Sequence, residues 1–288
     1  MSAKMAVSAA LARAAARLGE AHIESARLDA RVLLGHVLGV DPASLVMAGD
    51  DMLDVRALAA FGALVERRAR HEPVAYLTGR REFWSRNFAV TPDVLIPRPD
   101  SETLIEAALT VIPDYAARLR ILDLGTGSGC LLISLLLEFG EAVGLGIDVS
   151  EAAIAVARQN AAAHGLRARA QFRVSDWFSN VAGSFDLIVA NPPYLAKGEI
   201  AGLDEDVRGF EPYGALVPRE GGGSDALAAY RAIIAGLQAH LSPGGLVIFE
   251  AGKDQAGEIS ALLSASGFAP AGIFRDLSGI GRAVAARR

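Results

Sequence analysis

The chain of 288 residues is 52% hydrophobic and 21% charged, which excludes a disordered chain and predicts one large domain or two smaller ones. A single cysteine, Cys130, excludes an internal disulfide, and five scattered histidines predict no metal site. The net charge of −5 argues against nucleic-acid binding, and no membrane association is expected because no apolar run reaches the roughly 20 residues that cross a bilayer.

The N-terminal region, residues 1–73, is predicted to form a small helical domain. Residues 1–18 are Ala-rich with spaced Lys and Arg, which is typical of an amphipathic helix and not of a signal peptide, so a cytoplasmic location is expected. Apolar side chains at helical spacing predict a second helix over residues 28–38. A third helix is expected from about residue 54 to residue 70, with Pro73 as its stop.

Residues 74–97 differ from the region before them. Aromatic and β-branched residues stand among turn formers here, which predicts a short β-hairpin that links two domains. The segment leads into Leu95-Ile96-Pro97-Arg98-Pro99-Asp100-Ser101-Glu102. Asp100 or Ser101 is expected to cap a helix that begins there.

The second predicted domain is residues 98–288. From Arg118 onward it alternates short apolar runs with helical stretches, the pattern of a doubly wound α/β domain. The predicted fold class is α/β, with a seven-stranded, Rossmann-like doubly wound sheet and a small N-terminal helical domain. Helices are expected at 130–139 and 151–163, and the Gly221–Gly223 run predicts a loop. The expected strands are 121–124, 143–149, 171–174, 186–190 and 246–250, followed by two antiparallel strands within 272–286.

A glycine-rich turn, Asp123-Leu124-Gly125-Thr126-Gly127-Ser128-Gly129, follows the first of these strands. Glycines let the backbone approach a ligand closely and adopt positive φ. The second strand ends at Asp148, whose carboxylate can accept both hydroxyls of a ribose. Asp176 and Trp177 follow the third strand, where an adenine would lie. The glycine-rich turn alone suits a dinucleotide equally well, or a plain tight turn, and Asp148 alone does not discriminate between these cofactors. The acid and the aromatic after the third strand favour a cofactor other than a dinucleotide.

The fourth strand runs directly into Asn191-Pro192-Pro193-Tyr194. Ligands bind at the carboxyl ends of strands in an open α/β sheet, so Asn191 is expected beside the glycine-rich turn. If the Asn191 side-chain oxygen and the Pro192 carbonyl each accept one N–H, a planar amide or amino nitrogen is held in register with a sulfonium methyl group. These bonds strengthen as positive charge develops on the nitrogen.

The remaining chemistry needs little from the protein. Tyr194 can stack on the planar group, and no general base is required because the nitrogen becomes acidic once it is methylated. A simple strand-ending Pro-Pro turn is the structural alternative for this tetrapeptide. Cys130 is expected to be a small buried hydrophobe, and Glu250, at the end of the fifth strand, is either a substrate-side carboxylate or a solvated strand end.

Several segments taken together are typical of one family. They are residues 72–79, residues 95–102, the Gly125–Gly129 turn, Ser175-Asp176-Trp177-Phe178, Asn191–Tyr194, Phe210-Glu211-Pro212 and residues 244–250. By these segments, from about Glu72 onward, the chain resembles the peptide chain release factor glutamine N5-methyltransferases, also called the HemK family. The segment that ends in Arg98-Pro99-Asp100-Ser101-Glu102 is the more specific signal, because Asn-Pro-Pro-Tyr is shared with adenine-N6 DNA methyltransferases. Ser224-Asp225-Ala226-Leu227 departs from the Asp-Gly-Leu that the family often has.

The resemblance implies a two-domain enzyme that uses S-adenosylmethionine, releases S-adenosylhomocysteine and methylates the glutamine of the Gly-Gly-Gln loop of class I release factors. It implies that the helical domain helps to dock the release factor. The implied cofactor-binding residues are Gly125, Thr126, Gly127, Ser128, Gly129, Asp148, Asp176, Trp177 and Asn191. The implied glutamine-holding residues are Asn191, Pro192, Pro193 and Tyr194, of which Asn191, Pro192 and Tyr194 are the catalytic set, with Arg98 and Glu102 as walls of the substrate site.

Three other functions remain as alternatives. A DNA adenine-N6 methyltransferase would need base flipping and a basic cleft, which the acidic charge balance disfavours. A ribosomal protein glutamine N5-methyltransferase is closer, but as the family is understood its linker lacks the Pro-Asp-Ser-Glu pattern. A non-enzymatic binding module could keep the fold, but it would have little reason to retain Asn191 beside an intact cofactor loop.

Overall fold

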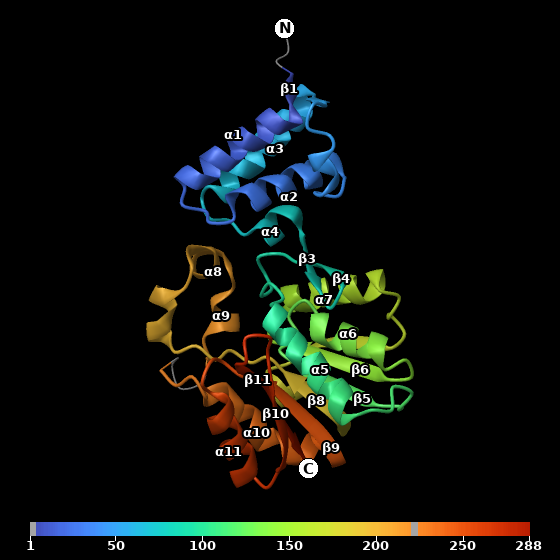
Figure 1. The fold of residues 1–288 in the computed structure, drawn as a ribbon. Helices are drawn as coiled ribbons and strands as arrows, with labels where there is room; N and C mark the ends of the chain where they lie inside the picture. Colours follow the sequence, from blue (N-terminus) through green and yellow to red (C-terminus); the bar gives the residue numbers. More distant parts are fainter. Residues whose placement is uncertain (1–3, 220–223) are drawn as a thin grey trace. The chain divides into compact units, whose positions relative to one another are not determined.

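The computed structural model describes residues 4–219 and 224–288, and Figure 1 shows their path. The chain divides into two compact units. The helical unit comprises Met1–Arg80 and Asp204–Phe210, and the sheet unit comprises Arg81–Leu203 and Glu211–Arg288. The loop predicted at Gly221–Gly223 lies outside the described residues. No helix in the described part of the chain is long and apolar enough to cross a membrane.

The helical unit is built on three amphipathic helices. Each buries an apolar stripe at helical spacing, and the three stripes form one core cluster. Asp54 caps the third helix by accepting the backbone N–H of Ala57 at 2.7 Å, and Gly39, with φ of 69°, ends the second. The elements of this unit are α1 (Val7–Glu20), α2 (Ala26–Leu38), α3 (Val55–Arg68), α4 (Val74–Thr78), α8 (Glu205–Phe210), η1 (Ser44–Val46), β1 (Met5–Ala6) and β2 (Met52–Leu53).

A buried arginine joins α8 to the rest of the helical unit. Arg68 at the end of α3 is 6% exposed and donates to Asp29 of α2 at 2.7 Å and to Asp206 of α8 at 2.8 Å. His71 Nδ1 lies 3.3 Å from Asp206 Oδ1. Burial of a guanidinium is tolerated only with such partners, so this charge network holds α8, from late in the sequence, against α2 and α3.

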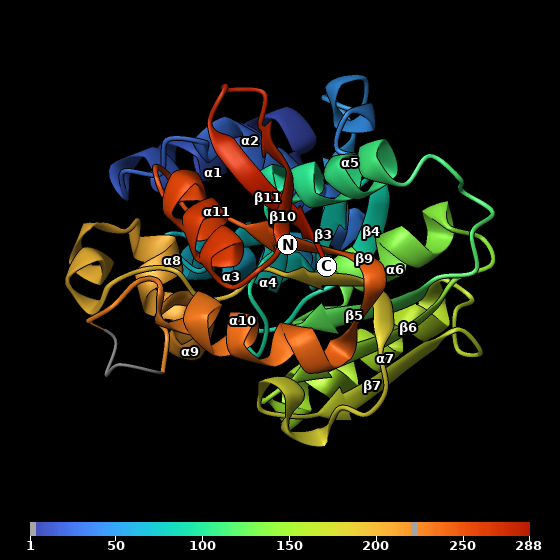
Figure 2. The same cartoon turned by 90° about the horizontal axis from the view of Figure 1, so that it is seen from below.

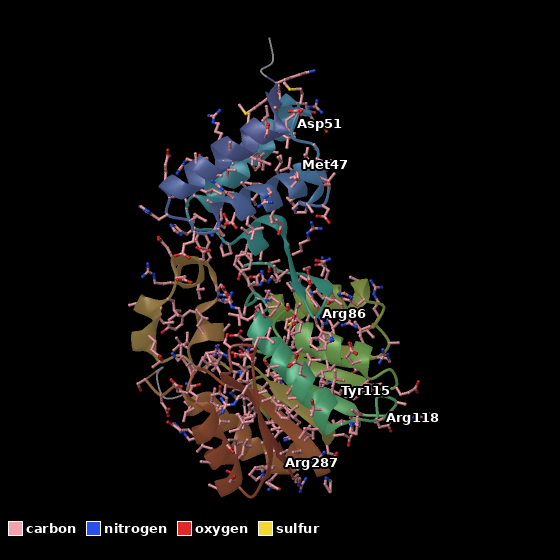
Figure 3. All side chains as sticks on the ribbon, viewed as in Figure 1. Met47, Asp51, Arg86, Tyr115, Arg118 and Arg287 are labelled. Atoms are coloured by element: carbon pink, nitrogen blue, oxygen red, sulfur yellow. The ribbon has the colours of Figure 1, made fainter. Side chains whose placement is uncertain are left out.

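The segment predicted as a hairpin is only partly extended. Residues 74–78 form α4 instead, which Pro73 precedes and Gly79 (φ 71°) ends, with Ala75, Tyr76 and Leu77 buried. The hairpin itself is β3 (Arg80–Phe83) and β4 (Arg86–Ala89), joined by two residues with positive φ, Trp84 and Ser85. Arg86, labelled in Figure 3, donates to Glu138 Oε1 at 3.0 Å.

The sheet unit contains the predicted seven-stranded sheet, in the order β10-β11-β9-β8-β5-β6-β7. The parallel strands, each of which ends close to its predicted boundary, are β5 (Arg120–Leu124), β6 (Val143–Asp148), β7 (Ala170–Val174), β8 (Phe185–Ala190) and β9 (Leu241–Glu250). The tail supplies β10 (Ala269–Arg275) and β11 (Gly281–Arg287), which pair antiparallel, as does β11 with β9. The prediction of an α/β sheet with an antiparallel end is confirmed.

Helices cover both faces of this sheet (Figures 1 and 2), and each face has its own core cluster. One face packs against α5 (Glu102–Val111), α6 (Cys130–Glu138) and α7 (Glu151–Ala163), and the other against α10 (Ala228–His240) and α11 (Ala256–Ala265). The short elements are η2 (Pro99–Ser101), η3 (Trp177–Asn180), η4 (Lys197–Gly202) and α9 (Tyr213–Leu216). The predicted cap of α5 is wrong: a 3-10 turn precedes the helix and neither Asp100 nor Ser101 makes a side-chain cap.

Candidate active site

The carboxyl ends of β5 and β8 meet at the centre of the sheet. Leu124 pairs with Ala190 in the parallel register, so the residues that follow them, Gly125 and Asn191, start side by side. In the sheet, β5 lies between β6 and β8: the chain leads from β5 to β6 on one side of β5 and later returns as β8 on its other side. This is the topological switch point, where open α/β sheets bind their ligands.

The glycine-rich turn adopts the backbone that its composition predicts. Gly125, Gly127 and Gly129 have φ of 75°, 52° and 80°, values that residues with a Cβ rarely adopt. The N–H groups of Gly125 and Thr126 both donate to the carbonyl of Ile147 on β6, at 2.9 and 2.8 Å. These bonds fix the turn to the neighbouring strand.

Asp148, the last residue of β6, bonds to the glycine-rich turn. One carboxylate oxygen accepts the N–H of Gly127 at 3.0 Å, and the other accepts the N–H of Ser150 at 2.9 Å. Burial raises the pKa of Asp148 above its ordinary value, and the backbone bonds oppose that rise. A carboxylate fixed in this way can still accept hydroxyl groups on its free lone pairs.

A second acidic residue lies beneath the turn. Asp123 on β5 is fully buried, and one of its oxygens accepts the hydroxyl of Thr126 at 2.6 Å. The other oxygen, Oδ1, has no hydrogen-bond partner among the described residues. Burial raises the pKa of Asp123 to about 7. Asp123 therefore supports the glycine-rich turn from within the sheet unit, through Thr126.

The turn faces a cavity of about 230 Å³ within the sheet unit. Trp177, which adopts a left-handed φ of 42°, lies across it from Gly125, where an added Cβ would stand 3.9 Å from the indole ring. The predicted residues that line this cavity are Arg98, Gly125, Thr126, Gly127, Ser128, Asp148, Asp176, Trp177, Asn191 and Pro193. The structure therefore brings the glycine-rich turn, the acid after β6, the acid and aromatic after β7 and the asparagine after β8 to one cavity.

Other predicted residues lie beside the cavity. Gly129 packs against α7, where a Cβ would stand 3.2 Å from Ala157, and Pro192 is buried. The Tyr194 ring lies against Gly252, where a Cβ would stand 2.9 Å from it. Glu102 accepts the backbone N–H of Trp84 at 2.7 Å and so holds the turn of the hairpin.

The cavity wall contains an ion pair between distant segments. Arg98 donates to Glu211, which is 7% exposed, and the same carboxylate accepts the N–H of Ile96 at 3.3 Å. Glu211 had only its place in the segment Phe210-Glu211-Pro212 to mark it in the sequence. Its role depends on Arg98, 113 residues away, so no local pattern reveals it.

The loop after β9 supports Tyr194, and its residues were not predicted as part of the site. Gln255 Nε2 donates to the carbonyl of Tyr194 at 3.0 Å, while the N–H of Gly252 donates to Gln255 Oε1 at 3.1 Å. Glu250 is 1% exposed, so the solvated strand end considered for it is wrong. It is buried because β9 lies between β8 and β11.

These features define the class of the protein. A sheet of this order, with a glycine-rich turn after β5, an acid at the end of β6 and Asn-Pro-Pro-Tyr after β8, is that of a class I methyltransferase. Among solved structures, the chain is similar to a methyltransferase from Pyrococcus furiosus, with a TM-score of 0.52 and 16% identity over 77% of this chain and 98% of that chain. It is also similar to the Thermus thermophilus 16S rRNA N2 G1207 methyltransferase in complex with AdoMet and guanosine, with a TM-score of 0.50 and 21% identity over 73% of this chain and 49% of that chain.

Sequence comparison is more specific. Residues 9–79 match the PrmC N-terminal domain, and residues 101–203 match the methyltransferase small domain. The chain is 46% identical to the release factor glutamine methyltransferase of Rhodospirillum rubrum, over 96% of this chain and 84% of that protein. It is also 46% identical to the enzyme of the same name from Cereibacter sphaeroides, over 96% and 97%. The chain belongs to the release factor glutamine methyltransferase family.

Proposed function

We infer that the chain transfers a methyl group from S-adenosylmethionine to the side-chain amide nitrogen, N5, of the glutamine in the Gly-Gly-Gln motif of class I peptide chain release factors. One observation carries this function within the site. Asn191 follows β8 directly and lines the same cavity as the glycine-rich turn that follows β5. Membership of the release factor glutamine methyltransferase family supports the choice of acceptor.

The residues of the cavity fit the cofactor. Asp148 can accept the hydroxyls of its ribose, and Trp177 offers a flat apolar surface for its adenine. Behind the glycine-rich turn, Asp123 Oδ1 is a buried acceptor with no partner among the described residues. When bound, S-adenosylmethionine supplies a methyl group on a positively charged sulfur, which a nitrogen lone pair can attack. The glycine at position 125 leaves room for the cofactor, because a side chain there would fill space beside Trp177.

Asn191 and Pro192 orient the acceptor nitrogen. An amide nitrogen is a poor nucleophile because its lone pair is delocalised into its carbonyl. The Asn191 Oδ1 and the Pro192 carbonyl can each accept one of its two N–H groups, which fixes the direction of the remaining lone pair. Both bonds strengthen as the nitrogen becomes positive, so they favour the transition state over the ground state.

Tyr194 acts as a surface and not as a base. Burial raises the pKa of its phenol to about 12, so it stays protonated at neutral pH. The methylated nitrogen loses its proton without a dedicated base, since it is strongly acidic at that stage.

The helical unit is proposed to dock the release factor. The helical domain predicted from the sequence, residues 1–73, precedes the predicted linker at 74–97 and the predicted methyltransferase domain at 98–288. We propose a cytoplasmic enzyme without membrane or direct nucleic-acid partners, whose protein substrate is a class I release factor. Arg98 and Glu102 are proposed to contribute to the substrate side, Arg98 directly at the cavity and Glu102 through the hairpin turn.

The test is methyl transfer from labelled S-adenosylmethionine to an unmodified class I release factor, with the modified residue mapped by mass spectrometry. We expect one methyl group on the glutamine of the Gly-Gly-Gln loop. A Gln→Ala change in that loop and Asn191→Ala in the enzyme should each abolish it. Asn87→Ala, which changes an exposed asparagine of the hairpin, should leave it intact. Transfer to a ribosomal protein or to DNA adenine instead would overturn the proposed acceptor.

A further inference from the structure

Glu250 is a buried carboxyl group with no role in the function proposed so far. It ends β9, is 1% exposed and pairs with Ala283 of β11. Its Oε2 atom has no hydrogen-bond partner among the described residues. The nearby phenol of Tyr230 does not satisfy the carboxyl group, because it donates to the backbone carbonyl of Glu250 instead, at 2.8 Å. A carboxyl group kept in such a place is costly, so its surroundings bear on its role.

Ser101 connects Glu250 to the acceptor-holding asparagine. Ala190 pairs with Phe249, so Asn191 and Glu250 follow neighbouring positions on two parallel strands. Ser101, 3% exposed, accepts a hydrogen bond from Asn191 Nδ2 at 3.3 Å. Its hydroxyl is also close enough to the Glu250 carboxyl to lower the pKa of that group. The three side chains form a directed series, from amide to hydroxyl to carboxylate.

The direction of this series follows from the hydrogen atoms available. A carboxylate only accepts, so an ionised Glu250 takes the single hydroxyl hydrogen of Ser101. The Ser101 oxygen must then accept from its other neighbour, which requires the NH₂ end of the Asn191 amide. The Oδ1 end is thereby turned away from Ser101 and left free to accept a substrate N–H.

We propose that Glu250 is a positioning residue that sets, through Ser101, which end of the Asn191 amide faces the methyl acceptor. The proposal rests on the function inferred above, because it assigns Asn191 Oδ1 to the acceptor nitrogen. Ionised Glu250 holds the productive orientation. Protonated Glu250 can itself donate to Ser101, which frees the hydroxyl to donate to Oδ1 and lets the amide turn over.

The proposal makes methyl transfer depend on pH in a definite direction. Burial raises the pKa of Glu250 to about 7, and Ser101 opposes that rise. Activity should therefore be present above about pH 7 and decline as the pH falls through that value. The ionisable groups that act on Glu250, or on which it acts, are Arg282 of β11, Arg98 and Asp100 at η2, Tyr194 after β8, Tyr230 of α10 and Cys130 of α6. Asp123 also has a pKa of about 7, so a variant is needed to assign the dependence.

The first experiment compares kcat against pH for the full chain and its Glu250→Gln variant. We expect Glu250→Gln to lower kcat about tenfold above pH 8, with the KM for the release factor and the Kd of S-adenosylmethionine little changed, and to flatten the rise through pH 7. Ser101→Ala should act likewise, and Ser101→Thr, which retains the hydroxyl, should restore most of the rate. Glu258→Gln changes an exposed carboxyl of α11 and serves as the matched control. An unchanged rise through pH 7 in Glu250→Gln, or equal rates for Ser101→Ala and Ser101→Thr, would overturn the proposal.

The second experiment needs no substrate and so separates this proposal from the proposed function. The chain has four asparagines, and selective ¹⁵N labelling gives four side-chain amide pairs, of which Asn191 is assigned by its loss in Asn191→Asp. The Asn191 pair should shift between pH 6 and pH 8 in the unaltered protein and remain fixed in Glu250→Gln and Ser101→Ala. If the Asn191 amide signals of the unaltered protein did not change between pH 6 and pH 8, the proposed link from Glu250 through Ser101 would be overturned, whatever the enzyme methylates.

Discussion

Asp148 shows how a single side chain serves both the fold and the site. Its two oxygens accept the N–H groups of Gly127 and Ser150, which fixes the glycine-rich turn to the start of α7. The same carboxylate lines the cavity. An ionised carboxylate suits the two backbone bonds, because it accepts on both oxygens without donating, and it also suits the proposed contact with ribose hydroxyls.

We expect Asp148→Asn to weaken S-adenosylmethionine binding about 10- to 100-fold, because a hydrogen bond to a charged group contributes about 1.5–3 kcal/mol and the asparagine NH₂ would face a backbone N–H. Isothermal titration calorimetry with S-adenosylmethionine checks this value. Glu151→Gln removes an exposed charge from the same end of α7 and should bind normally. Equal affinities for Asp148→Asn and the unaltered protein would contradict the role given to Asp148.

The buried carboxyl groups also link stability to pH. The folded pKa of Glu250 is about 7, above its ordinary value of 4.5, so the folded state binds the proton more tightly than the unfolded state does. The free energy of unfolding is then highest at low pH and falls as the pH rises from about 4.5 to about 7. Asp123, with a pKa raised from 3.8 to about 7, contributes in the same direction.

Glu250→Gln should remove its part of this dependence. Urea unfolding at pH 5 and pH 8 gives the free energy of unfolding of the variant relative to the unaltered protein. This difference should shift in favour of the variant as the pH rises, by on the order of 1–3 kcal/mol. The Glu258→Gln control should follow the unaltered protein at both values. Parallel pH curves for Glu250→Gln and the unaltered protein would show that the Glu250 carboxyl is not protonated by folding.

Among the elements, the loop between β9 and α11 positions Tyr194. An added Cβ at Gly252 would stand 2.6 Å from Gln255 Oε1 and 2.9 Å from the Tyr194 ring, both closer than real contacts allow. The loop thus requires a glycine for space, although its φ is not in the left-handed region.

We expect Gly252→Ala to displace Tyr194 and lower methyl transfer about 10- to 100-fold, with S-adenosylmethionine binding retained, because small errors of position are costly in such reactions. Gly257→Ala is the matched control, since nothing lies within 4 Å of its Cβ position and alanine in α11 should stabilise the helix by roughly 0.5–1 kcal/mol. Calorimetry and the mass-spectrometric assay separate the two effects. Full methyl-transfer activity in Gly252→Ala would contradict the role proposed for Tyr194 in the site.

The elements that could be predicted are those whose signal is local. Helix α7 occupies the predicted residues 151–163, and each parallel strand was expected from its own apolar run. Helix α8 was not predicted, since its six residues are held by Arg68, far away in the sequence. The site divides in the same way: the glycine-rich turn is a local motif, whereas Ser101 meets Asn191 across 90 residues and no spacing rule could pair them.

At the scale of the whole molecule, the buried Arg68 contributes to the stability of the helical unit by pairing with two carboxylates. We expect Arg68→Met to lower the free energy of unfolding of that unit by about 3–5 kcal/mol, because Asp29 and Asp206 would be left without their cation. Arg17→Met is the control: Arg17 pairs with Glu66 at the surface, where the side chains are 39% and 54% exposed, and its loss should cost at most about 1 kcal/mol. Urea unfolding checks both values, and equal effects would show that burial adds nothing to the Arg68 network.

The placement of α8 has a consequence for how the chain is made on the ribosome. The helices α1 to α3 emerge first, and Arg68 then has Asp29 as a partner, but Asp206 lies 138 residues further along. At a synthesis rate of about 5–20 residues per second, the second carboxylate follows roughly 7–28 s later. During that interval the guanidinium lacks one of its two anions, so the nascent N-terminal region is incomplete until most of the sheet has been translated. A chain that stalls before α8 therefore leaves a weakened bundle, which quality-control proteases would find sooner than the finished protein.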